Sequence, residues 1–107
     1  MPNSLTQDSA LTRFRTALAE VYGDRLERAV LYGSRARGDH HVHSDYDIAL
    51  FIKQPGSLSD ELDRLAAIST NILFDTGAVI SAKPFPAGAY RERTGFMSEL
   101  RKDGLDL

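Results

Sequence analysis

The stretch AVLYGSRARGDHHVHSDYDIALFI, residues 29–52, decides how this chain folds. It opens with a short apolar run that ends at Tyr32, and Gly33 stops it, which is typical of a buried strand. From Asp45 to Ile52 the residues alternate, which predicts a second strand with two different faces. The stretch therefore predicts a glycine-serine turn and an aspartate pair at the ends of two strands.

The alternation of the second strand assigns its residues to faces. One face is predicted to be apolar throughout and consists of Tyr46, Ile48, Leu50 and Ile52. The other face is predicted to be polar only at its beginning and consists of Asp45, Asp47, Ala49 and Phe51.

Helical spacing appears on both sides of this stretch. The first predicted helix starts at Asp8 or Ser9 and ends at Gly23. Its apolar stripe is Leu11, Phe14, Leu18 and Val21. The second starts at Ser57, which forms a capping-box pattern with Asp60, and ends before Gly77. Its apolar stripe is Leu58, Leu62, Leu65, Ile68 or Ser69, and Ile72.

Two more elements complete the predicted chain. Residues 78–85 form a third strand, and residues 96–102 form a short amphipathic helix that Gly104 ends. The order helix, strand, strand, helix, strand, helix predicts an α/β or α+β fold, a small mixed sheet with helices packed on it. We expect one domain over residues 1–107, with residues 1–8 as a loose tail.

Composition limits the classes of function. The chain has no cysteine, which excludes disulfides, thiolate metal sites and a cysteine nucleophile. Its net charge of −2 and interspersed charges argue against direct nucleic-acid binding. No apolar run approaches the roughly 20 residues of a membrane helix, and no secretory signal is evident. We expect a cytoplasmic protein.

Asp45 and Asp47 are the candidate metal ligands and catalytic residues. Carboxylates two residues apart on a strand point to one side, where both can bind a hard cation such as Mg²⁺. Gly33 and Ser34 are the candidate phosphate-binding residues, because glycine lets the backbone approach a phosphate. Alternatively, the aspartates belong to a solvated turn and Ser34 is a helix N-cap.

The motif as a whole is more specific than its parts. Gly33-Ser34, ten intervening residues and then Asp45-x-Asp47 resemble the signature of the DNA polymerase β superfamily of nucleotidyltransferases, in the spacing of its minimal branch. The Arg35-Ala36-Arg37-Gly38 segment fits as well. Residues 100–105 are similar to the tail of minimal nucleotidyltransferases paired with HEPN proteins, which are antitoxin-type domains.

The resemblance implies a polymerase-β-like nucleotidyltransferase fold that binds a nucleoside triphosphate at Gly33-Ser34. It also implies two Mg²⁺ ions at Asp45 and Asp47, and transfer of AMP from ATP to a hydroxyl. In HEPN-paired members the acceptor is a tyrosine of the partner ribonuclease toxin, so a hetero-oligomer is expected. The alternatives are an antitoxin that only binds its partner and, more remotely, a small-molecule nucleotidyltransferase.

One feature departs from the family. Many members carry a third carboxylate in the next strand, where this chain has Ser81. Asp75 is the nearest acid, but we predict that it bonds local backbone in a turn. Arg35 and Arg37 either offset pyrophosphate charge or form surface pairs, for example with Asp39.

The loop between the two strands carries three histidines, His40, His41 and His43. Without a cysteine or a second group of ligands, they indicate a solvated loop rather than a zinc site.

Overall fold

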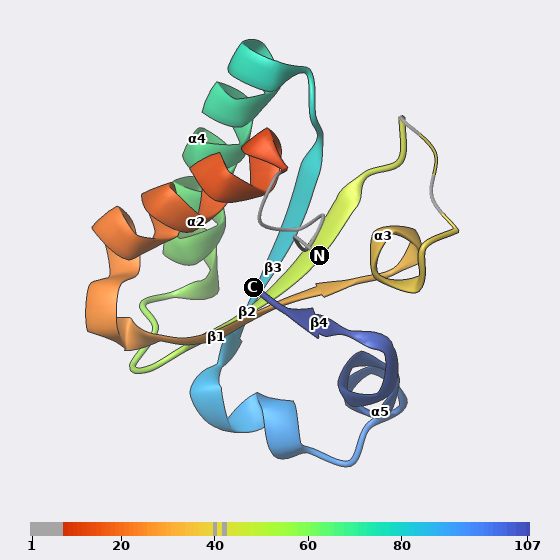
Figure 1. Ribbon diagram of the computed structural model, residues 1–107. Helices are drawn as coiled ribbons and strands as arrows, with labels where there is room; N and C mark the ends of the chain where they lie inside the picture. Colours follow the sequence, from red (N-terminus) through yellow and green to blue (C-terminus); the bar gives the residue numbers. More distant parts are fainter. Residues whose placement is uncertain (1–7, 40, 42) are drawn as a thin grey trace.

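The computed structural model describes residues 8–39, 41 and 43–107 and shows a mixed α/β fold (Figure 1). The main elements, in chain order, are α2 (Ser9–Tyr22), β1 (Leu26–Tyr32), α3 (Ser34–Arg37), β2 (Tyr46–Ile52), α4 (Leu58–Thr76), β3 (Ile80–Pro86), α5 (Gly95–Asp103) and β4 (Leu105–Asp106). Two short 3-10 helices are η1 (Gly23–Arg25) and η2 (Ala87–Arg91). Most of the predicted tail, residues 1–7, lies outside the described residues.

The sheet has the strand order β3-β2-β1-β4. The β1–β2 and β1–β4 pairs are antiparallel, whereas β2 and β3 are parallel. A parallel pair needs a long crossover, which α4 provides. The prediction of a small mixed sheet with helices is confirmed. Strand β4 was not predicted, because two residues carry no recognisable alternation.

The two faces of β2 pack against different layers. Helices α2 and α4 lie side by side on one face, where Tyr46, Ile48, Leu50 and Ile52 are buried (Figure 1). Ala49 and Phe51 are buried in a second cluster with residues of η2 and α5. The predicted division of β2 is therefore confirmed, and it places Asp47 on the α5 side of the sheet.

Helix α2 has the predicted ends. The Asp8 carboxylate accepts a hydrogen bond from the Leu11 N–H at 3.0 Å, and Gly23 closes the helix with a φ of 53°. Asp8 also accepts a hydrogen bond from the Tyr46 hydroxyl at 2.5 Å, so it belongs to the folded part rather than to a tail. Val21 was assigned wrongly to the apolar stripe, since it is 44% exposed and Tyr22 is buried instead.

Helix α4 begins as predicted, with the Ser57 hydroxyl accepting from the Asp60 N–H at 3.1 Å. It ends at Gly77, whose φ of 77° suits glycine. The predicted apolar stripe was wrong in its first turns, because Leu58 and Leu62 are exposed and Glu61 is buried. The stripe from Leu65 through Ile68 and Ile72 is confirmed.

Candidate active site

Asp47 lies on β2 between the two neighbouring strands. Its register partners are Tyr32 on β1 and Ser81 on β3. Asp45 immediately precedes the first residue of β2 and is exposed, whereas Asp47 is half-buried. The two carboxylates are close enough for the charge of Asp45 to act on Asp47. The structure thus brings the two aspartates together at one end of the sheet.

Gly33 brings the end of β1 into contact with Asp47. It has a φ of 76°, and a Cβ atom added at this position would lie 2.6 Å from Asp47 Oδ2. Any other residue would need both the left-handed backbone and a displaced carboxylate. Glycine is therefore required here for the close approach of the turn to the aspartate.

Ser34 starts the single turn of α3 directly after this glycine. The N–H groups of Ala36 and Arg37 both donate to the Gly33 carbonyl at 3.1 Å. Gly33, not Ser34, is the N-cap, and no side chain caps the helix. The alternative interpretation of Ser34 as an N-cap is therefore wrong. Within the described residues, the Ser34 hydroxyl has no hydrogen-bond partner and remains available beside the turn.

The charge balance at Asp47 is unfavourable for a carboxylate. Burial raises the pKa of Asp47, and the negative charge of Asp45 raises it further. The Lys83 ammonium opposes both effects. No side chain or backbone N–H of the described residues donates a hydrogen bond to the Asp47 carboxylate. A bound cation would supply the missing compensation.

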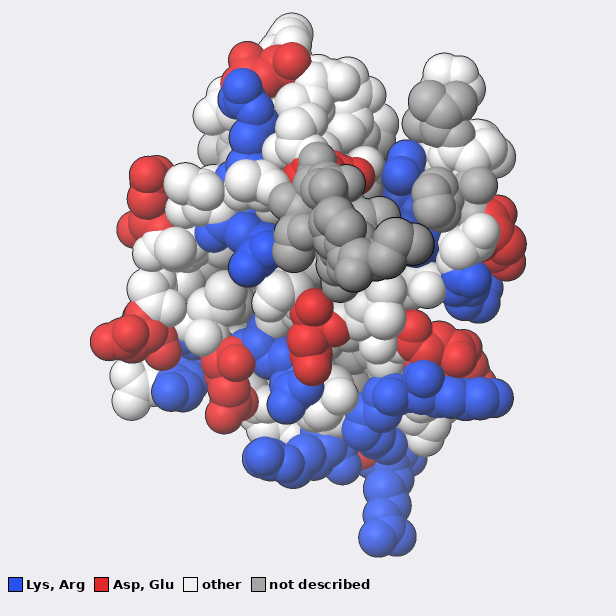
Figure 2. Space-filling model, viewed as in Figure 1, with Lys and Arg blue, Asp and Glu red and all other residues white. Residues whose placement is uncertain are grey.

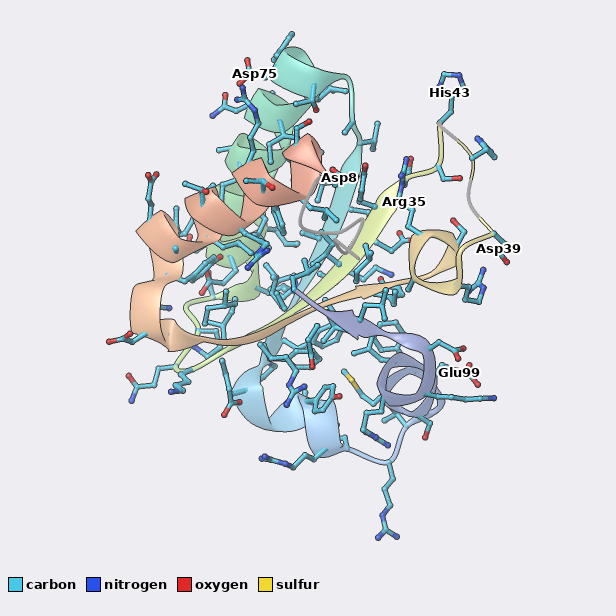
Figure 3. The ribbon with its side chains drawn as sticks, viewed as in Figure 1. Asp8, Arg35, Asp39, His43, Asp75 and Glu99 are labelled. Atoms are coloured by element: carbon cyan, nitrogen blue, oxygen red, sulfur yellow. The ribbon has the colours of Figure 1, made fainter. Side chains whose placement is uncertain are left out.

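The two arginines of the motif lie in different surroundings. The Nε of Arg35 donates to the Ser44 carbonyl at 2.9 Å, and its guanidinium lies 3.8 Å from the Tyr46 ring centroid. Arg35 therefore fastens the loop before β2. The Nε of Arg37 pairs with Asp39 at 3.3 Å on the surface. This surface pair is one of the two alternatives that the sequence left open for Arg37. Figure 3 shows Arg35 beside the start of β2 and Asp39 beyond α3.

The histidine loop is held by local hydrogen bonds. The Ser44 hydroxyl accepts from the His41 N–H at 3.0 Å, and His41 Nδ1 accepts from the His43 N–H at 3.2 Å. Figure 3 shows His43 at the outer end of this loop. The prediction for His40 lies outside the described residues.

Asp75 lies on α4 and not on β3, whose Ser81 is the residue beside Asp47. It lies near the C-terminal end of α4, on the helical side of the sheet (Figure 3). It accepts from Arg13 at 2.7 Å in an exposed ion pair. The prediction that it bonds the following backbone was wrong, because the Gly77 N–H donates to Leu73 and the Ala78 N–H donates to Thr76.

Ser81 occupies the expected place of the third carboxylate, directly beside Asp47. Lys83 was not predicted as a site residue, although it follows Ser81 by two residues and shares its face. The alternation of the third strand, started at Ser81, was the signal that could have found it. Lys83 is thus the charged side chain that β3 places near Asp47.

The site offers two carboxylates rather than a closed metal cage. No group of three or more His, Cys, Asp or Glu side chains able to hold a metal occurs in residues 8–39, 41 and 43–107. Mg²⁺ is typically bound through one or two carboxylates together with water and substrate phosphates. Asp45 and Asp47, with Gly33 leaving room at Oδ2, fit such a shared site.

Charges of both signs are interspersed over the face shown in Figure 2. Residues 8–39, 41 and 43–107 contain no helix of the length and hydrophobicity needed to span a bilayer.

Comparisons with known proteins agree on one family. The family described as Polymerase beta, Nucleotidyltransferase matches residues 17–83. A protein of Methanocaldococcus jannaschii named "Putative protein adenylyltransferase MJ0141" is 24% identical over 97 residues, covering 91% of this chain and 94% of that relative. A second protein of this organism, with the same name but for the number MJ0604, is 32% identical over 78 residues, covering 73% of this chain and 72% of the relative.

A solved structure described as "Crystal structure of the toxin-antitoxin with AMP-PNP" is similar with a TM-score of 0.65 and 15% identity. The likeness covers 89% of this chain and 69% of that one. At this identity it shows a shared fold.

Proposed function

The chain belongs to the polymerase β nucleotidyltransferase family, and from this premise we propose that it transfers AMP from ATP to a tyrosine hydroxyl of a HEPN-type toxin. One observation carries the proposal. The turn at Gly33 meets the carboxylate of Asp47, which supports a phosphate held by the turn beside a cation held by Asp45 and Asp47. A nucleoside triphosphate and its metal need such a juxtaposition.

The roles of the residues follow from the chemistry. The turn at Gly33 and Ser34 would hold the β- and γ-phosphates, and Asp45 and Asp47 would hold Mg²⁺. When bound, the metal neutralises phosphate charge and orients the reacting oxygens. The acceptor oxygen forms a bond to the α-phosphorus, and the bond from that phosphorus to the bridging oxygen breaks. Pyrophosphate leaves, and the hydroxyl proton passes to water.

The acceptor proposal rests on the relatives and on the exposure of the site. Two relatives carry the name "Putative protein adenylyltransferase", and the similar solved structure is described as a toxin-antitoxin with AMP-PNP. Asp45 is exposed directly before the first residue of β2, so an acceptor on another protein can approach the aspartate pair. A protein partner can supply that recognition.

The test uses ATP labelled at the α-phosphate, Mg²⁺, and the co-expressed protein encoded by the neighbouring gene. We expect label on a tyrosine of that partner, and no label in chelator or with Asp47→Asn. Equal ATP affinity with and without metal by titration calorimetry would contradict the proposal.

A second candidate function is an antitoxin that acts by binding alone. The observation that favours it is Ser81 in the place of a carboxylate, because β3 then offers no carboxylate as a base for the acceptor hydroxyl among the described residues beside Asp47. In this case the complex forms and the toxin is silenced, but no label is transferred. Silencing by Asp45→Asn and Asp47→Asn variants at wild-type level would support it.

A further inference from the structure

The site face of β3 carries a hydroxyl and an ammonium group instead of an acid. Ser81 pairs with Asp47, and Lys83 pairs with Ala49 one step further along β2. Alternate residues of a strand share a face, so Ser81, Lys83 and Asp47 all lie on the α5 side of the sheet. The field of Lys83 reaches Asp47, whose pKa it lowers against the effect of burial.

Lys83 is available for a substrate. Its side chain is exposed and forms no ion pair with any of the described residues. Its Nζ lies 5.9 Å from the centroid of the Phe96 ring. Together with Phe85, Glu92 and Phe96 it lines a mostly apolar cavity of about 460 Å³. Glu92 is the acidic side chain of this lining, and Asp47 is the acid that faces Lys83 from β2.

The order of the strands indicates the side of the site from which the acceptor oxygen approaches. The phosphate-binding turn ends β1, the aspartates are on β2, and Lys83 is on β3, on the opposite side of β2 from β1. In phosphoryl transfer the attacking and leaving oxygens are roughly in line. If pyrophosphate leaves over the end of β1, the acceptor oxygen approaches over β3. Lys83 therefore lies on the acceptor side.

We propose that Lys83 binds the attacking oxygen of the acceptor hydroxyl and stabilises the negative charge that develops on it. This assignment rests on the proposed transferase function. The acceptor O–H loses its proton to water, the oxygen forms its bond to the α-phosphorus, and the bond to pyrophosphate breaks. Lys83 takes no part in the proton transfer and acts by its positive charge.

The positive charge of Lys83 compensates in part for the carboxylate that is missing at Ser81. A carboxylate would remove the proton, whereas a cation lowers the pKa of the hydroxyl so that water can take it. A phenol ionises near pH 10, which is within reach of such a shift. Each tenfold gain in the ionised fraction at neutral pH corresponds to about 1.4 kcal/mol.

The experiment compares Lys83→Met, Lys83→Arg and the surface control Lys53→Met, each with the partner protein as acceptor. We expect Lys83→Met to lower kcat at pH 7 about tenfold or more and to move the rising limb of the pH profile about one unit higher. Lys83→Arg should keep most of the activity, because it keeps the charge. The dissociation constant of Lys83→Met for a non-hydrolysable ATP analogue should stay within about threefold of the wild-type value. The substitution changes the side of the site where the acceptor binds and leaves the phosphate-binding turn unchanged.

Three results would overturn the assignment. An unchanged pH profile with unchanged kcat removes any role for Lys83. A loss of nucleotide affinity equal to the loss of kcat would make Lys83 a phosphate ligand instead. If the wild-type protein transfers no AMP at all, the transferase proposal fails and this assignment fails with it, whereas failure confined to the Lys83 variants leaves that proposal standing.

Discussion

The carboxylates of Glu61 and Asp47 have opposite surroundings. Glu61 on α4 is 1% exposed and accepts hydrogen bonds from the Tyr22 hydroxyl at 3.1 Å, the Gly56 N–H at 2.9 Å and Arg64 at 2.7 Å. Burial alone would raise the pKa of Glu61, but these donors lower it. Asp47 is less buried than Glu61, and its carboxylate accepts no hydrogen bond from any of the described residues. The pKa of Asp47 is raised.

The difference shows which carboxylate serves the fold and which serves a ligand. A buried charge is tolerated when the protein supplies its hydrogen bonds, as at Glu61. A carboxylate that the fold leaves without donors, beside another negative charge, is poised to bind something positive. The same side-chain chemistry thus has a structural use on the α4 side of the sheet and a predicted metal-binding use on the α5 side.

The largest expected effect is loss of transfer when a site aspartate is neutralised. Asp45→Asn and Asp47→Asn should each lower kcat/KM more than about a hundredfold, since even residues behind metal ligands contribute about 10- to 100-fold. The transfer assay with labelled ATP measures this. Circular dichroism should show an unchanged fold, and unfolding of either variant would instead make the pair structural.

The matching change at Glu61 should affect stability rather than chemistry. Glu61→Ala leaves the Tyr22 hydroxyl, the Gly56 N–H and Arg64 without their acceptor, so we expect a loss of about 3 kcal/mol in the free energy of unfolding. Urea denaturation measures this. At a temperature where the variant is folded, its transfer rate should remain near the wild-type value. A Glu61→Ala variant that is stable but impaired in transfer would show that Glu61, like Asp47, serves the site and not the fold.

The pH dependence of stability should have opposite signs at the two carboxylates. The folded pKa of Glu61 is lowered, so its stabilisation is present above the unfolded pKa of about 4.3 and is lost as pH falls through the folded pKa. The folded pKa of Asp47 is raised, so its ionisation destabilises the metal-free protein as pH rises through that pKa.

Metal-free Asp47→Asn should therefore melt slightly above the wild-type protein at pH 7, by about 2 °C because solvent screens a half-exposed group. The advantage should vanish near pH 3, where Asp47 is protonated. Thermal melts at both pH values measure it. A lower melting temperature for the variant at pH 7 would show that the Asp47 charge is compensated within the protein.

The smallest effect is expected at Asp75, an acid that belongs to neither class. Its ion pair with Arg13 is exposed on both sides, and such pairs contribute about 0–1 kcal/mol. Asp75→Asn should lower stability by less than about 1 kcal/mol and keep transfer within about tenfold of wild type. A loss as deep as that of Asp47→Asn, with the fold preserved, would bring Asp75 into the site.

Most of the fold, and the position of the aspartate pair on one side of a strand, could be predicted from patterns within short stretches of the sequence. The alternation along β2 is a property of the extended backbone, so it placed Asp45 and Asp47 on one side without knowledge of neighbouring strands. The caps Asp8 and Ser57 and the stop at Gly77 are likewise decided within a few residues. Such features can be predicted because their causes lie close together in the chain.

The sequence by itself therefore determined strands β1, β2 and β3, helices α2, α4 and α5, the turn at Gly33 and the spacing that indicates the family. Only the tertiary structure decided that Glu61 and not Leu62 faces inward, because its donors come from α2 and from the loop before α4. Only the parallel register of β3 brought Ser81 beside Asp47, and with it Lys83 onto the face of the sheet that carries Asp47. Helical spacing tolerates either choice, and a strand's pattern does not specify its register, so these contacts depend on segments far apart in the sequence.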